Sequence, residues 1–102
     1  MIIVSQDKKT IVNFDNVIYA NVRKLPPNEK GYAINISTFE RNFERFSLYD
    51  TEEKAKEVLS EIYKKYSDWQ TMGMVKDVYL QKQVIAGDKS EYFNVYLMPE
   101  NN

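Results

Sequence analysis

The chain has 102 residues and a formal net charge of −1, with 43% hydrophobic and 28% charged residues. This composition is typical of a folded soluble domain, and the small net charge provides no general attraction to nucleic acid or to an anionic membrane. Cysteine and histidine are absent, which excludes disulfides, Cys/His zinc sites, cysteine nucleophiles and Ser-His pairs. We therefore expect a non-enzymatic protein without a cofactor. The length of the chain suits one domain, which we expect to comprise residues 1–102.

The N-terminal half contains several short β-rich runs. Residues 2–4 and 10–14 flank five polar residues, a pattern that predicts a hairpin. The apolar run at the N-terminus is far too short for a secretory signal, and no segment approaches the length of a membrane span. A cytoplasmic location without membrane association is the expectation.

Two alternating segments follow, separated by the turn Pro26-Pro27-Asn28-Glu29-Lys30-Gly31. Residues 17–25 and 32–39 alternate apolar and polar side chains, so we expect two strands that pair antiparallel. The alternation places Ile18, Ala20, Val22, Ile34 and Ile36 on the buried face.

The segment from Phe39 to Phe46 is ambiguous. Phe39, Phe43 and Phe46 fit a short helical turn, but the segment also fits a tight connection into a strand. We interpret it as a connection into a strand over residues 46–49, which leads directly into a helix.

The clearest element in the sequence is an amphipathic helix over residues 51–66. Asp50 followed by Glu53 fits a capping box, although Thr51 is an alternative cap. Pairs such as Glu52 with Lys56 support the exposed face. The predicted buried stripe consists of Ala55, Val58, Leu59, Ile62, Tyr63 and Tyr66.

Signals are weaker after the helix. Residues 67–73 suggest an irregular, packed segment, and residues 75–85 fit a strand, although their spacing is also near-helical. A turn at 86–91 precedes an alternating strand over 92–98, with Phe93, Val95 and Leu97 expected inward and Pro99 ending it. The predicted fold class is α+β: an antiparallel sheet of about five short strands, the helix packed on it, then a C-terminal β-hairpin. The last strand is expected to return beside the first.

Three stretches resemble a known group of proteins: MIIVSQDKKTIVNFDNV at the start, LYDTEEKAKEVLSEI in the middle and NVYLMPE at the end. They are similar to short uncharacterised proteins of Gram-positive bacteria and of their phages and mobile elements. The resemblance implies a small cytoplasmic accessory protein of phage or prophage origin, and it implies no catalytic residues.

Aromatic and basic side chains are the candidate contact residues. Tyrosines that alternate with the apolar core positions suggest an exposed face that binds a protein or a second copy of the chain; these are Tyr19, Tyr32, Tyr92 and Tyr96. The alternative is that residues 67–80 cover this face as a second small core. Arg41 and Arg45 lie between phenylalanines, a composition suited to an acidic partner. The alternative is that these phenylalanines are core and the arginines are solvated.

Two further sets of residues are candidates for other functions. A weak nucleic-acid interface is the alternative function, and its candidate residues are Arg23, Lys24, Arg41 and Arg45. Four aspartates are candidates for metal or acid-base chemistry, but each lies where a turn or helix cap needs a short acceptor: Asp7, Asp15, Asp50 and Asp88. We therefore expect structural roles for them.

Overall fold

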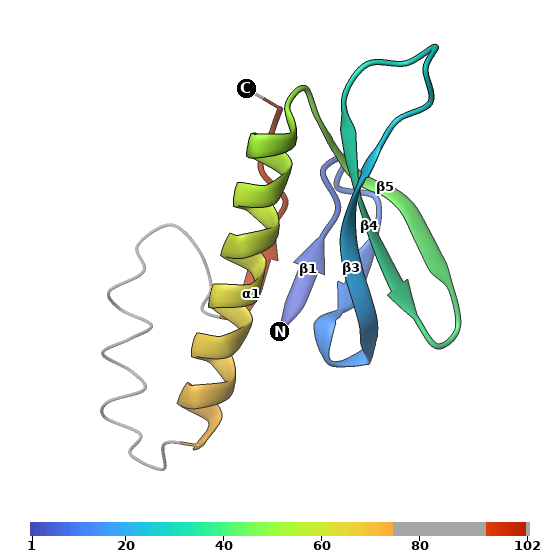
Figure 1. The fold of residues 1–102 in the computed structure, drawn as a ribbon. Coiled ribbons are helices and arrows are strands. Elements are labelled where there is room, and N and C mark those ends of the chain that lie inside the picture. The colour runs from blue at the N-terminus through green and yellow to red at the C-terminus, as the bar shows by residue number, and fades with distance from the viewer. Residues whose placement is uncertain (75–93, 102) are drawn as a thin grey trace.

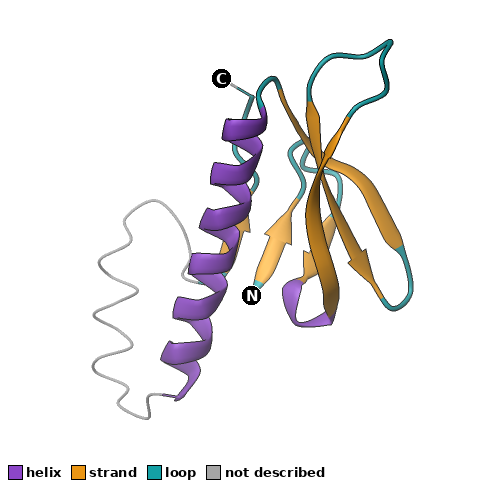
Figure 2. Cartoon of the chain, viewed as in Figure 1, coloured by secondary structure: helices purple, strands orange, loops and turns teal. Residues whose placement is uncertain are grey.

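The computed structural model describes residues 1–74 and 94–101 (Figure 1). These residues form strands, one short 3-10 helix and one long α-helix, so the α+β class is confirmed (Figure 2). The elements in chain order are β1 (Ile2–Val4), β2 (Ile11–Asn13), η1 (Phe14–Asn16), β3 (Val17–Lys24), β4 (Tyr32–Thr38), β5 (Asn42–Tyr49), α1 (Glu52–Met74) and β6 (Val95–Leu97). The strands form two three-stranded sheets, ordered β2-β1-β6 and β3-β4-β5, which corrects the expectation of one sheet of about five strands.

The first sheet begins with the predicted hairpin. Ile3 of β1 lies opposite Val12 of β2 in an antiparallel pair. The polar loop is held by Ser5, whose hydroxyl donates to Asp7 Oδ1 (2.6 Å) and accepts from the Thr10 N–H (3.0 Å). On its other side β1 pairs in parallel with β6, so the expectation that the last strand lies beside the first is confirmed. The expected C-terminal hairpin involves residues 75–93, which lie outside the described part of the chain.

The inward face of β6 is the opposite of the predicted one. Tyr96 and Met98 are buried, whereas Leu97 is 42% exposed. The reason is the parallel register, which places Tyr96 beside Ile3, because paired residues in neighbouring strands share a face of the sheet. Ile3 is fully buried, so Tyr96 must face the core with it.

The second sheet confirms the antiparallel pairing of the two alternating segments. Val22 lies opposite Ile34, and Ala20 lies opposite Ile36. An irregularity between Val17 and Tyr19 shifts the register, and Ile18 is consequently 52% exposed rather than buried as predicted. β5 begins at Asn42 and not at Phe46, so most of the ambiguous segment is strand.

The helix α1 begins where predicted and extends eight residues beyond Tyr66, to Met74. Thr51 is the cap, because its hydroxyl accepts from the Lys54 N–H (3.1 Å), while the Asp50 carboxylate accepts from Asn101 (3.1 Å). Glu52 and Lys56 form the expected pair (2.8 Å). In this extension Trp69 packs against the core. Just before it, Tyr66 packs edge-on against Phe14 of η1, and its hydroxyl donates to Asp15 Oδ1 (2.9 Å).

One core joins the two sheets and the helix, which lies along β3, β4 and β5 (Figure 1). Ile3, Ile34 and Ile36 are fully buried, as is Val58 of α1. The predicted stripe of α1 is correct except at Tyr63, which is 75% exposed. The buried members of the core are Met1, Ile3, Val12, Ile34, Ile36, Phe46, Tyr49, Ala55, Val58, Ile62, Tyr96 and Met98.

The side chain of Gln6 joins three distant segments. Its Oε1 accepts from the Leu48 N–H (2.9 Å), and its Nε2 donates to the carbonyls of Leu48 and Pro99 (3.0 Å each). The Gln6 N–H also donates to the Phe46 carbonyl (3.2 Å). The loop after β1 therefore pairs with the outer edge of β5 as an added strand would, and so protects that edge.

We expect Gln6→Ala to lower the free energy of unfolding by roughly 1–3 kcal/mol, because it leaves these backbone groups without their partner. Urea titration measures the change. Lys9→Ala, at an exposed position of the same loop, is the control and is expected to be nearly neutral. Equal midpoints for both variants would contradict the bridging role.

Candidate functional site

The structure separates the three candidate tyrosines that it describes. Tyr19 is 48% exposed on β3, and Tyr92 lies outside the described residues. Tyr32 packs against the core because it shares a face of β4 with Ile34. Tyr96 is 6% exposed, and its hydroxyl donates to Glu61 Oε2 of α1 (2.8 Å). The expectation that Tyr32 and Tyr96 face away from the core is therefore wrong.

Arg45 is held within the chain. Its guanidinium donates to both carboxylate oxygens of Glu29 (2.7 and 3.0 Å), and its N–H donates to Asn35 Oδ1 (2.9 Å). The hydrogen bonds from Arg45 lower the pKa of Glu29, and those to Glu29 raise the pKa of Arg45. The residue occupies a positive φ of 54° in β5, within the irregular step of the β4–β5 pairing. Arg45 thus fastens the β3–β4 loop to β5 rather than projecting freely.

The connection between β4 and β5 is a hydrogen-bonded turn, residues 38–41, which we name the Phe39 turn. The Thr38 N–H donates to the Arg41 carbonyl (2.8 Å), and the Thr38 hydroxyl both donates to that carbonyl and accepts from the Arg41 N–H (3.1 Å each). Arg41 stacks over the Phe43 ring at 4.9 Å. Phe39, at the tip, is 89% exposed. Of the three phenylalanines in this region, Phe46 is buried, Phe43 is half-buried and Phe39 lies in solvent.

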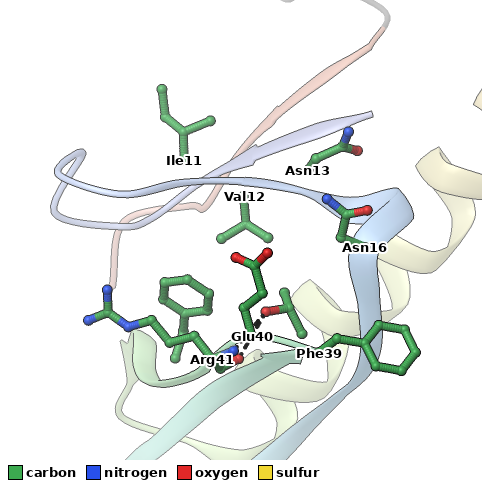
Figure 3. A pocket seen from close by; sticks show the side chains of 9 residues that line it. Ile11, Val12, Asn13, Asn16, Phe39, Glu40 and Arg41 are labelled. Carbon is green, nitrogen blue, oxygen red and sulfur yellow. Dashed lines mark hydrogen bonds between the residues drawn. The ribbon is translucent and has the colours of Figure 1, made fainter.

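The Phe39 turn borders a groove of about 490 Å³ whose other wall is β2 (Figure 3). Figure 3 shows the side chains of Val12 and Glu40 pointing into the space between β2 and the turn, whereas the Phe39 ring points out of it. Ile11, on the β2 side, is 68% exposed. The groove therefore combines exposed apolar groups with one carboxylate and one guanidinium.

The four candidate basic residues, all in the described part of the chain, do not form one patch. Arg23, Lys24 and Arg45 line a shallow hollow of about 230 Å³ on the outer face of β3-β4-β5, together with Tyr19 and Glu44. Arg41 lies in the other groove. Since Glu29 pairs with Arg45, the hollow presents Arg23 and Lys24 as its main cationic groups.

A third groove, of about 520 Å³, lies between α1 and β3 and is lined mainly by apolar side chains. Leu59, Ile62 and Tyr63 contribute from the helix, and Phe14 and Ala20 line the opposite wall. No pattern in the sequence predicts this groove. Of the residues that line it, Tyr63 is the one whose position differs from the prediction, because the helical periodicity places it in the core.

Asp7 and Asp15 have structural partners, and the turn role predicted for Asp7 is confirmed. Asp7 accepts from the Ser5 hydroxyl and from the Lys9 N–H (2.9 Å), and the hydrogen bond from Ser5 lowers its pKa. Asp15 accepts from Tyr66. Asp88 lies outside the described residues. Among residues 1–74 and 94–101, no three acidic side chains lie close enough together to hold a metal ion.

Comparisons with protein-family models, curated proteins and solved structures returned no significant match. Within the described part of the chain, no helix combines the length and the apolar composition needed to cross a bilayer.

Proposed function

We propose that this protein is a non-enzymatic protein-binding accessory module whose partner binds at the Phe39 turn. The observation that carries the proposal is Phe39 itself: a large aromatic side chain that is 89% exposed at the tip of a turn fixed by its own hydrogen bonds. Folding leaves this ring in water, whereas burial against a partner would stabilise it by about 1.5–3 kcal/mol.

The surroundings of Phe39 favour recognition of a protein. Aromatic residues and arginines dominate binding hot spots, and Arg41 of the same turn lies over the Phe43 ring. Because the turn is already ordered, a partner would fix few additional dihedral angles on binding. The partner that fits has an apolar pocket for Phe39 and a carboxylate for Arg41.

The resemblance to small proteins of phages and mobile elements supports the biological context of the proposal. In that context the partner is a host or phage protein in the cytoplasm.

Affinity capture from a lysate of a Gram-positive host, followed by mass spectrometry, identifies the partner, and calorimetry with the purified partner measures its affinity. Phe39→Ser is expected to weaken binding roughly thirtyfold, because a central aromatic hot spot contributes about 2 kcal/mol or more. Tyr63→Ser, which removes a similarly exposed ring from α1, is the matched control and should leave the affinity unchanged. A partner that binds wild type and Phe39→Ser equally would contradict the proposal.

The alternative function is weak binding of nucleic acid through Arg23, Lys24, Arg41 and Arg45. The observation that favours it is the position of Tyr19, which is 48% exposed beside Arg23 and Lys24 in the hollow of β3-β4-β5. An aromatic ring beside cations can stack on an unpaired base. Binding of this kind weakens steeply as salt rises, so a single-stranded oligonucleotide should be retained in a low-salt gel shift. No retention at low salt would exclude this alternative.

A further inference from the structure

We propose that two copies of this chain associate through β3, pairing antiparallel about a twofold axis so that the two β3-β4-β5 sheets continue as one sheet. This proposal concerns a different surface from the Phe39 turn and does not depend on the function proposed above.

The first support is the row of backbone groups on the free side of β3. β3 is the outer strand of its sheet among the described residues and has eight residues, compared with three in β2. The Leu25 N–H donates to the Gly31 carbonyl (3.1 Å), which fixes the alternation of the β3–β4 ladder. Residues 19, 21 and 23 therefore bond to β4, while the N–H and C=O groups of Ala20, Val22 and Lys24 point away from it.

The second support is the apolar groove beside this edge. A strand added to β3 would place alternate side chains on the helix side of the sheet, where Ala20 already lines the groove. The ring of Tyr63 is 75% exposed on the other wall, and Leu59 lies one turn before it. From Tyr19 to Lys24 the pairing of β3 is regular, and a regular edge strand beside unburied apolar groups is a template for pairing with another strand.

The third support is the self-complementarity of the β3 sequence, VIYANVRK. Backbone groups that point outward must face each other, so Ala20 can lie opposite Val22 of the second copy. In this register Arg23 lies opposite Tyr19 of the second copy on the outer face, where a cation–aromatic contact is favourable. A register shifted toward the basic end would place Arg23 opposite itself, and like charges opposite each other destabilise a sheet.

The twofold axis then passes beside Asn21, which lies opposite its own copy. Because the axis is perpendicular to the sheet, both α1 helices lie on the same face and the two Tyr63 rings approach each other across the axis. A sheet of six strands covered by two helices results from the two three-stranded halves.

The chain contains no cysteine, so a single introduced cysteine gives an unambiguous cross-linking test. Asn21→Cys places the two thiols in a non-hydrogen-bonded antiparallel pair, with Cα atoms about 4.5 Å apart, which suits a disulfide. Under mild oxidation we expect most of this variant to run as a covalent dimer. Arg23→Cys, which lies opposite Tyr19 and not opposite itself, is the matched control and should cross-link little.

Sedimentation of the uncross-linked protein completes the test. Wild type should be a dimer at high concentration, Tyr63→Ser should shift the equilibrium to monomer by at least tenfold in Kd, and Phe39→Ser should leave it unchanged. A monomer at all concentrations, or equal cross-linking of Asn21→Cys and Arg23→Cys, would overturn the proposal. Phe39→Ser tests the partner site and Tyr63→Ser tests the dimer interface. The two proposals can therefore fail independently of each other.

Discussion

Ile62→Ala is expected to lower the free energy of unfolding by about 2–5 kcal/mol, the range for truncating a large buried aliphatic side chain. Ile62 is 1% exposed and belongs to the core between α1 and the sheets. Removing its outer carbons costs the transfer energy of those atoms and also leaves a cavity. Because α1 depends on packing rather than on helix propensity alone, we expect the helix and the β3-β4-β5 sheet to be destabilised together.

The neighbouring residue provides the control. Tyr63→Ala removes a larger side chain, yet its ring is 75% exposed, so we expect a change within about 0.5 kcal/mol. Both variants should be unfolded in urea at low protein concentration, because self-association would add stability to the wild type. Similar losses for the two variants would show that Tyr63 is packed and would contradict the orientation of α1 described above.

Much of the fold could be predicted because local chemistry determines it. The turn at Pro26 to Gly31, the strands on either side of it and the beginning of α1 each follow from residues close together in sequence. Ala55, Val58 and Ile62 are buried as the helical period requires. The helical period also places Tyr63 in this stripe. Its ring nevertheless lies outside the core, in the groove between α1 and the outer strand β3, and the helical period cannot show where the sheet ends.

The division into two sheets could not be predicted in this way. Alternation of side chains shows which face of a strand is buried, but it does not show which strands exchange hydrogen bonds. β6 illustrates the limit: its alternation was recognised, but its buried face is set by a parallel pairing with β1, more than ninety residues away in the chain. The extension of α1 likewise brings Trp69 against a core built from residues far away in the chain, which helical periodicity over residues 51–66 does not reveal.

The candidate site was predicted only in part. Arg41 and the nearby phenylalanines were recognised by composition, but composition could not distinguish Phe46, which is buried, from Phe39, which lies at the tip of a turn. The role of Arg45 depends on Glu29, sixteen residues earlier in the β3–β4 loop. The open edge of β3 has no signature in side chains, because it consists of backbone groups.

Gly31→Ala is the second change with a large expected effect. Gly31 has a φ of +114°, a conformation that residues with a Cβ rarely adopt, and a Cβ at this position would lie 2.7 Å from the Tyr49 carbonyl oxygen. The oxygen belongs to the backbone at the end of β5, so it cannot move without disturbing the pairing of Tyr32 with Tyr49. Backbone strain of about 1–3 kcal/mol and a packing clash of similar size both oppose the substitution.

We therefore expect Gly31→Ala to lower the free energy of unfolding by roughly 3 kcal/mol or more, which corresponds to a decrease in Tm of more than about 10 °C for a domain of this size. Thermal unfolding followed by circular dichroism measures the decrease. Asn28→Ala, at an exposed position in the same loop, should leave Tm nearly unchanged. If Gly31→Ala also melts like the wild type, the close approach of this loop to β5 is wrong. The position of Glu29 in this loop, and therefore its ion pair with Arg45, would then also be wrong.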